Sequence, residues 1–161
     1  MKTLVVYYSR TGNTRGVAEK IAELLHADLD EIIDKKNRSG MIGYLSAGKD
    51  AMTKANIDIG YKLNPADYDM VVLGTPIWGS TITPALRTYL TAHSGTIKKT
   101  AFFATSGGSG IGKIAQEMEQ LSTKPIAQLL LKTKLGKKGI DVTVHSDALQ
   151  SFCTDIEKNS M

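Results

Sequence analysis

The sequence predicts a three-layer, doubly wound α/β domain, with a five-stranded parallel sheet between two layers of helices. The first observation is a set of short apolar, β-branched and aromatic runs, typical of strands buried on both faces. Four are clear and one, after the first helical segment, is weaker: Leu4–Tyr8, Met70–Gly74, Thr100–Thr105, Ile126–Leu131 and Leu29–Ile33. The second observation is that helical patterns separate these runs. Such alternation is typical of parallel sheets with right-handed crossovers.

Four segments carry apolar residues at helical spacing. Their stripes are Val17, Ala18, Ile21, Ala22 and Leu25; Ala85, Leu86, Tyr89 and Leu90; Ile111, Ile114, Ala115, Met118 and Leu121; and Ala148, Leu149, Phe152, Cys153 and Ile156. Pro84, directly after Thr83, suits the first position of the second helix. Ser146 or Asp147 is the expected N-cap of the last helix.

The segment from 35 to 68 has the weakest pattern. It predicts a helix around Met41–Lys54 and a loop through Asn64 and Pro65. No internal repeat, linker or low-complexity tract interrupts the chain of 161 residues, so we expect a single domain over residues 1–161.

The net charge argues against a nucleic-acid partner. The chain carries a formal charge of +4, from 20 Lys and Arg against 16 Asp and Glu, and its densest basic stretch holds Lys132, Lys134, Lys137 and Lys138. A nucleic-acid surface needs more basic residues than this, with aromatic or motif support that the sequence lacks. We interpret residues 132–138 as a solvated basic loop; the alternative is steering of an acidic partner or an anionic cofactor.

The remaining composition predicts a cytoplasmic protein. No apolar run reaches the about 18 residues of a membrane span, and the short run after Met1 is interpreted as a strand and not a signal peptide. Cys153 is the single cysteine, which fits a reducing compartment; we interpret it as a core residue, with a redox role as the alternative. The dispersed His26, His93 and His145 are interpreted as ordinary surface or core residues.

The chemistry is expected in the loops that follow the strands, because ligands of open parallel sheets bind beyond the carboxyl ends of the strands. Three such loops are rich in Gly, Ser and Thr: SRTGNT from Ser9, TPIWGSTITP from Thr75 and TSGGSG from Thr105. Since all three are expected at one sheet edge, together they indicate a binding site more strongly than any one does alone.

The first loop, Ser9 to Thr14, has the composition of an anion site at a helix start. Unpaired N–H groups and partial positive charge favour an anion there, and Gly12 permits close approach of the backbone. The alternative is that the hydroxyl residues only cap the helix. The loop lacks the Gly-Lys-Ser/Thr ending of a nucleotide triphosphate loop. Lys113 breaks the dinucleotide glycine pattern in the third loop, and Thr75 stands where a phosphorelay receiver needs Asp.

Trp78 lies on the second loop, outside any amphipathic stripe. A tryptophan there either covers the core or offers a stacking surface to a flat aromatic ligand. Beside an anion site, the second interpretation gains weight: the three loops describe a pocket for a ligand with a phosphate and a planar ring.

These residues resemble the flavodoxin-like family of flavin mononucleotide (FMN) proteins. Ser9-Arg10-Thr11-Gly12-Asn13-Thr14 matches the family's phosphate loop, and the second and third loops resemble its ring-binding loops. The resemblance runs from Lys2 to about residue 122 and implies the strand order 2-1-3-4-5, with FMN at the switch point.

The resemblance also implies roles for individual residues. Ser9, Thr11, Asn13 and Thr14 would hold the phosphate, with Arg10 screening its charge. Trp78 would stack on the isoalloxazine ring. The full set of implied cofactor-binding residues is Ser9, Arg10, Thr11, Gly12, Asn13, Thr14, Thr75, Pro76, Ile77, Trp78, Gly79, Thr105, Ser106, Gly107, Gly108 and Gly110. Neither a catalytic side chain nor a metal is expected, because the flavin itself carries the chemistry.

Two departures from the family pattern affect the expected function. Flavodoxins commonly sandwich the ring between two aromatics, whereas Thr105–Gly110 contains none; Tyr44 is a candidate replacement. Flavodoxins are also usually acidic, whereas this chain is basic. The first departure leaves open whether the one-electron redox potentials of the flavin are tuned as in flavodoxins. The second leaves open whether the protein has the usual redox partners of flavodoxins.

Three functions remain on this basis. The first is an FMN electron carrier that serves a redox partner protein or a small-molecule acceptor. The second is an NAD(P)H-dependent quinone or flavin reductase, whose open ring face the small residues Gly107 and Gly108 would allow. The third is a module that keeps the fold and serves only as an interaction surface.

Overall fold

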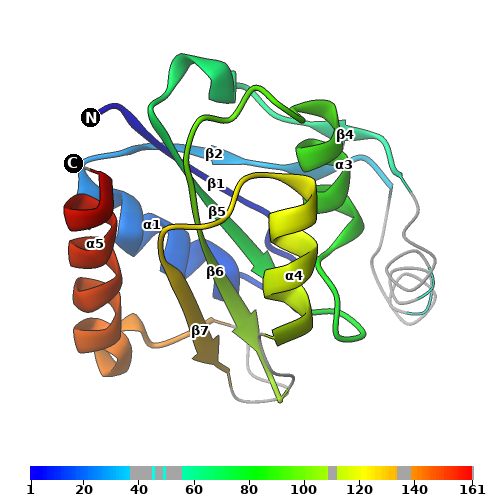
Figure 1. The fold of residues 1–161 in the computed structure, drawn as a ribbon. Coiled ribbons are helices and arrows are strands. Elements are labelled where there is room, and N and C mark those ends of the chain that lie inside the picture. The colour runs from blue at the N-terminus through cyan, green and yellow to red at the C-terminus, as the bar shows by residue number, and fades with distance from the viewer. Residues whose placement is uncertain (37–44, 46–48, 50–55, 109–111, 134–138, 161) are drawn as a thin grey trace.

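The computed structural model describes residues 1–36, 45, 49, 56–108, 112–133 and 139–160. Its centre is a five-stranded, all-parallel sheet in the order β2-β1-β5-β6-β7 (Figure 1). The strands are β1 (Thr3–Tyr7), β2 (Asp28–Glu31), β5 (Met70–Pro76), β6 (Thr100–Ser106) and β7 (Gln128–Lys132). Counted along the chain, these five strands have the order 2-1-3-4-5, so the predicted fold class and strand order are confirmed.

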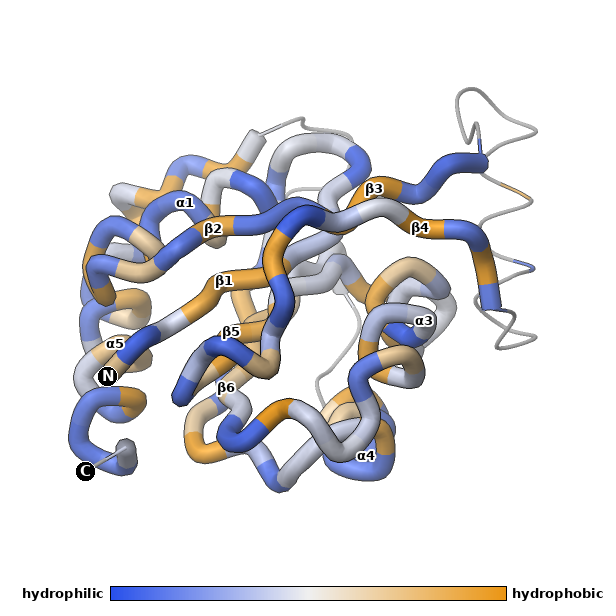
Figure 2. The backbone as a smooth tube through the Cα atoms, turned by 90° about the horizontal axis from the view of Figure 1, so that it is seen from above, coloured by the Kyte–Doolittle hydropathy of each residue, from blue (hydrophilic) through white to orange (hydrophobic). Residues whose placement is uncertain are grey.

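Helices cover both faces of the sheet. On one face lie α1 (Asn13–Leu25) and α5 (Ser146–Ser160); on the other lie α3 (Pro84–Ala92) and α4 (Gly112–Leu121) (Figure 1). The sheet separates two apolar clusters, because alternate strand residues point to opposite faces. Val5 belongs to the cluster under α1 and α5, and Leu4 to the cluster under α3 and α4. The apolar backbone segments lie between the helical layers in Figure 2.

The central strands are buried over almost their whole length, as their continuous apolar runs predict. Val72 of β5 lies between Val5 of β1 and Ala101 of β6, and all three are inaccessible to solvent. Gly74 makes room for the ring of Phe103, since a Cβ at this position would lie 2.2 Å from Cζ of Phe103. The strand predicted at Ile126–Leu131 is displaced by two residues at its start and forms the sheet edge as β7.

The weak strand predicted at Leu29–Ile33 is two strands in the structure. After β2, the Ile32 N–H still donates to Tyr7 O at 2.8 Å, and the chain then leaves the sheet. It continues as β3 (Ile33–Asp34), which pairs antiparallel with β4 (Ile59–Gly60) as a separate small sheet. No sequence pattern predicted this pair of strands.

Within the described residues, two short 3₁₀ helices lie in the connections. Asn64 caps η1 (Pro65–Asp67) by accepting from Ala66 N–H at 3.2 Å. The second, η2 (Val142–His145), runs directly into α5, so Ser146 has helical backbone angles and the prediction of an N-cap at Ser146 or Asp147 is wrong. The capping side chain is Asp141, which accepts from Thr143 N–H at 3.0 Å.

The helix predicted around Met41–Lys54 lies almost entirely outside the described residues; Leu45 and Lys49 within it are helical. Cys153 is buried in α5, as expected for a core residue. Among the described helices, none is both long and apolar enough to cross a membrane.

Candidate functional site

The three predicted loops meet at the carboxyl edge of the sheet, and Thr105 joins them. Its hydroxyl lies 2.8 Å from the hydroxyl of Thr14, in the first turn of α1. Its carbonyl accepts from Ile77 N–H at 3.0 Å, which attaches the second loop to β6. Both threonine side chains are buried. The first, second and third loops therefore lie together at one sheet edge, as the topology predicted.

The start of α1 has the features of an anion site. Gly12 is the N-cap residue, with a left-handed φ of 92°, and it has no side chain that could accept from the first helical N–H groups. The first bond after the cap runs from Gly16 N–H to Gly12 O at 3.0 Å. Because the initial N–H groups of a helix lack intrahelical partners and carry partial positive charge, Asn13–Arg15 present donors to an anion. Capping by hydroxyl side chains, the alternative interpretation, does not describe this helix start.

Two observations test whether a phosphate group fits there. A Cβ placed on Gly12 would meet nothing within 4 Å, so the space beside the cap is open. Asn13 Oδ1 is buried without a hydrogen-bond partner. Buried polar atoms of this kind are rare. A half-turn of the amide would place its N–H₂ donors at the same point, whereas the oxygen can accept from a ligand hydroxyl. The residues therefore fit a phosphorylated, hydroxyl-bearing ligand.

The other side chains of the first loop differ in their positions. Ser9 accepts from Gly12 N–H at 3.2 Å and so shapes the loop. Ser9 and Arg10 are half-buried, whereas Thr11 is exposed. Arg15 follows in the helix and donates two hydrogen bonds to Glu31, at 2.7 and 2.8 Å.

Trp78 begins a tight two-residue turn. It exchanges two backbone hydrogen bonds with Thr81, both at 3.1 Å. Gly79 and Ser80 between them have φ values of 57° and 62°, the backbone of a type I′ turn. Consequently the Ile77 and Trp78 N–H groups are both engaged within the protein.

The indole of Trp78 is half-buried. It packs on the apolar cluster under α3 and α4, where Tyr8 meets it edge to face with 5.5 Å between ring centroids. The interpretation of Trp78 as a cover for the core therefore describes part of its surface. The remainder is exposed at the same edge as the α1 start.

Thr75 and Pro76 prove to be the last residues of β5. The Thr75 hydroxyl is buried and lies 3.1 Å from that of Thr83, which in turn caps α3 by accepting from Leu86 N–H. The structure thus gives Thr75 a role in joining β5 to α3, and the start predicted for this helix at Pro84 is confirmed.

The third loop places small residues at the surface, beside the carboxyl end of β6. Ser106 is buried at the end of β6, and its hydroxyl accepts from Gly108 N–H at 3.1 Å. Gly107 and Gly108 are exposed. Gly110 and Tyr44, both named in the sequence analysis, lie outside the described residues.

A buried ion pair between Arg87 and Glu117, next to the Trp78 turn, was not predicted from the sequence. Arg87 of α3 donates to Glu117 of α4 from Nη2 at 2.6 Å and from Nε at 3.0 Å. Burial alone would raise the pKa of Glu117, but hydrogen bonds from Thr81, Arg87 and Ile82 N–H together hold it below its usual value. Neither residue belongs to the apolar stripes that predicted these helices, so no sequence pattern pointed to the pair.

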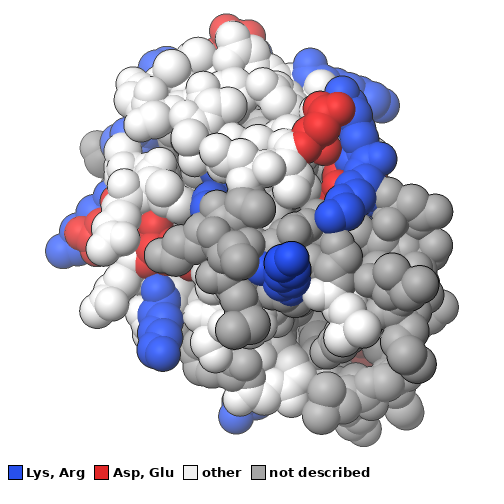
Figure 3. All heavy atoms as spheres, turned by 90° about the vertical axis from the view of Figure 1, so that its right-hand side faces the viewer, with Lys and Arg blue, Asp and Glu red and all other residues white. Residues whose placement is uncertain are grey.

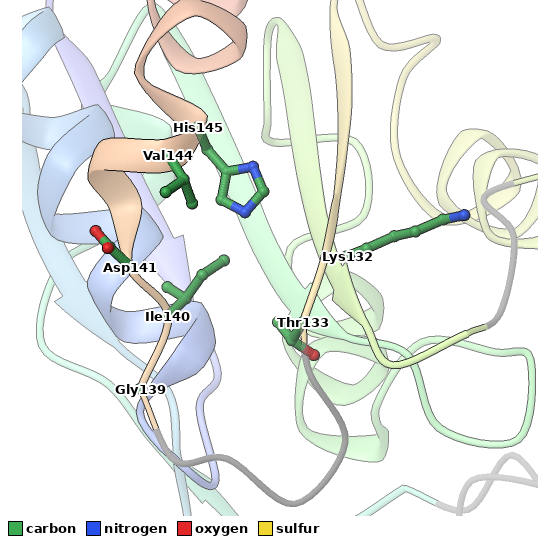
Figure 4. A pocket seen from close by; sticks show the side chains of 7 residues that line it. All are labelled: Lys132, Thr133, Gly139, Ile140, Asp141, Val144 and His145. Carbon is green, nitrogen blue, oxygen red and sulfur yellow. The ribbon is translucent and has the colours of Figure 1, made fainter.

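A cavity of about 440 Å³ lies at the far end of the same edge, between β7 and the segment leading to α5 (Figure 4). Ile140, Val144 and His145 point into it, whereas Lys132 of the predicted basic loop points away. Thr133 N–H donates to Ser106 O at 2.8 Å, so this cavity borders the third loop. Lys134, Lys137 and Lys138 lie outside the described residues.

The chain belongs to the flavodoxin family: a flavodoxin family model matches residues 2–140. No curated protein matches the chain. Solved structures have the same fold. A flavoprotein from Lactobacillus acidophilus, crystallised in complex with FMN, is 20% identical over 91% of this chain and 97% of its own, with a TM-score of 0.67.

Two further structures extend the comparison. A protein from Bacteroides uniformis described as a flavoprotein is 25% identical over 95% of this chain and 97% of its own, with a TM-score of 0.70. Flavodoxin 1 from Bacillus cereus, in its oxidised state, is 18% identical over 98% of each chain, with a TM-score of 0.56.

Proposed function

We propose that this protein binds FMN non-covalently and transfers electrons through it. FMN is the cofactor expected from membership of the flavodoxin family, and the flavoprotein from Lactobacillus acidophilus was crystallised with it. The observation that carries the proposal is that Thr105 joins the open start of α1 to the second and third loops at one sheet edge. An anion site and an exposed indole surface thereby lie at the same edge.

When bound, FMN supplies the redox chemistry through its isoalloxazine ring. The protein supplies position and electrostatics. The N–H groups at the start of α1, with the Thr11 hydroxyl, hold the phosphate, and Trp78 offers an aromatic face to the ring. Ser106, Gly107 and Gly108 limit the third side of the site without covering it by a large side chain.

The electron carrier is the favoured function, and a redox partner protein or a small-molecule acceptor would take its electrons. Cytoplasmic location is part of the same proposal, since a single buried thiol suits a reducing compartment. The alternative is an NAD(P)H-dependent quinone or flavin reductase. The observation that favours it is the exposed pair Gly107 and Gly108, which leaves room for a second substrate beside the ring.

The first experiment tests the cofactor and its contact with Trp78. We expect purified protein to quench the fluorescence of added FMN, and Trp78→Ala to weaken FMN binding by about 1–3 kcal/mol, by analogy with stacking of bases on aromatic side chains. Isothermal titration with FMN measures the affinity. A native protein that leaves excess FMN unquenched would instead support the interaction module.

A second measurement separates carrier from reductase. A carrier reduced by dithionite should pass its electrons on to an acceptor but oxidise NADPH only slowly in steady state. Continuous turnover of NADPH with a quinone would identify the reductase. Both outcomes leave the FMN proposal standing, because they concern only where the electrons come from and go.

A further inference from the structure

We propose that Arg87 and Glu117 are positioning residues for Trp78, holding its turn in the orientation that receives the flavin ring. This inference rests on the proposed FMN site and adds two residues that no family motif in the sequence pointed to. Neither residue is offered as a ligand contact. They act through Thr81, which closes the turn that Trp78 begins.

Glu117 accepts hydrogen bonds with both of its carboxylate oxygens. Its Oε2 accepts from the Thr81 hydroxyl and from Ile82 N–H, the latter at 3.2 Å. Its Oε1 accepts from Arg87. One carboxylate thus fixes two consecutive residues that directly follow the turn.

Arg87, on α3, contacts the same two residues that Glu117 contacts from α4. Its Nη2 donates to the Thr81 hydroxyl at 2.9 Å and to Ile82 O at 3.3 Å. Thr81 is consequently held by three groups: Glu117, Arg87 and the backbone of Trp78. Gly79 and Ser80 are exposed. The contacts of Thr81 therefore hold the closing end of the turn, whereas the Ile77 N–H to Thr105 O bond and the packing of Trp78 on Tyr8 hold its starting end.

Burial makes a purely stabilising role a poor explanation of the pair. The side chains of Arg87 and Glu117 are only 6% and 11% exposed. Removing two charges from water is costly, and well-packed apolar residues often replace such a pair without loss of stability. Arg87 Nη1 is even left buried without a partner. The directional contacts with Thr81 are what apolar side chains could not reproduce.

The chain has its own reporter for the test, because Trp78 is the single tryptophan. Its emission and its quenching by acrylamide report the position of the turn in the protein without FMN. Glu117→Gln keeps the shape of the side chain but replaces one acceptor oxygen by an N–H₂ donor, which faces other donors. We expect stronger acrylamide quenching of Trp78 and roughly tenfold weaker FMN binding.

A double variant separates positioning from stability. Arg87→Met with Glu117→Met removes both charges, and we expect its thermal unfolding to remain close to that of the native protein. Its Trp78 emission and FMN affinity should nevertheless resemble those of Glu117→Gln. Thr123→Val is the matched control, since it removes the part-buried hydroxyl contact of Thr123 with Thr100, at 3.0 Å, just beyond the C-terminal end of α4. It should change stability alone.

The outcomes are distinct. Unchanged quenching of Trp78 in folded Glu117→Gln or in the double variant overturns the inference. So does unchanged FMN affinity, provided that Trp78→Ala weakens it. If Trp78→Ala itself leaves FMN affinity unchanged, the proposed stacking contact fails, and the quenching measured without FMN still decides whether the ion pair holds the turn.

Discussion

At the scale of single residues, Thr11 and Thr14 show how similar side chains in one loop take different tasks. Both stand in the SRTGNT loop and were assigned alike to a phosphate. The structure leaves Thr11 exposed, whereas the Thr14 hydroxyl is buried at 2.8 Å from that of Thr105. The contact between the Thr14 and Thr105 hydroxyls therefore holds the first and third loops together. It also fixes the orientation in which the Thr14 hydroxyl can make a further hydrogen bond.

This difference gives a paired prediction. Thr14→Val should lower the free energy of unfolding by about 1–3 kcal/mol, because it leaves the buried Thr105 hydroxyl without its partner. Thr11→Val should leave stability within about 0.5 kcal/mol of the native value, since the side chain is exposed. Urea unfolding followed by circular dichroism measures both.

Ligand binding completes the comparison. Both variants should bind FMN less tightly and riboflavin nearly as before, because riboflavin lacks the phosphate. Equal losses for the two ligands in Thr11→Val would contradict a phosphate site at this loop. Equal stability of the two variants would contradict the structural role of Thr14.

At the scale of elements, β5 and β6 meet at Gly74, which has the least room for a side chain among the described glycines. A Cβ at this position would lie 2.2 Å from Phe103 Cζ and 2.6 Å from Cε1, so the aromatic ring occupies the space above the glycine. β5 also carries Thr75 and Pro76 into the site. A shift of the ring would therefore be transmitted to the start of the second loop.

Gly74→Ala should accordingly destabilise the protein by about 1–3 kcal/mol through overpacking. Adding Phe103→Leu should recover part of the loss, because the smaller side chain makes room for the methyl group. Gly108→Ala is the control, since a Cβ there meets nothing within 4 Å. Thermal unfolding is measured for the native protein, Gly74→Ala, Gly74→Ala with Phe103→Leu, and Gly108→Ala. A Gly74→Ala protein as stable as Gly108→Ala would contradict the close packing of Phe103 on Gly74.

Elements with long, repetitive patterns were predictable, and elements defined by a distant partner were not. The runs of β1, β5 and β6 are buried on both faces, so hydrophobicity alone located them. The β3–β4 pair joins Ile33 to Gly60 over two residues per strand, too short for any periodicity. Arg87 and Glu117 likewise meet only because α3 and α4 pack side by side, and no local pattern connects positions 30 residues apart.

At the scale of the whole molecule, the net charge of +4 does not produce a uniform basic face. Among the described residues on the face shown in Figure 3, acidic side chains lie beside basic ones. Several of the basic groups are paired; Arg15 contacts Glu31, and Arg87 contacts Glu117. We therefore expect the electrostatics that matter for function to be local, at the α1 start as the proposed anion site and at the buried pair of Arg87 and Glu117.

The buried pair also predicts how the stability of the molecule depends on pH. The pKa of Glu117 lies below its usual value of 4.5 in the folded protein. In the unfolded chain the carboxyl takes up a proton near pH 4.5, whereas in the folded protein it stays ionised to lower pH. Its contribution to stability is thus complete above pH 4.5 and is lost as the pH falls through the folded pKa.

The free energy of unfolding of the native protein should therefore decrease below pH 4.5, and its advantage over Glu117→Gln should shrink in the same range. His93 titrates in a separate window. Burial lowers its pKa from 6.5, so its neutral form stabilises the fold above that pH and the contribution is lost below it. Because both proteins retain His93, the difference between their urea-unfolding curves isolates Glu117. A difference that stays constant from pH 7 to pH 3 would show that the carboxylate of Glu117 is not held ionised by Arg87 and Thr81.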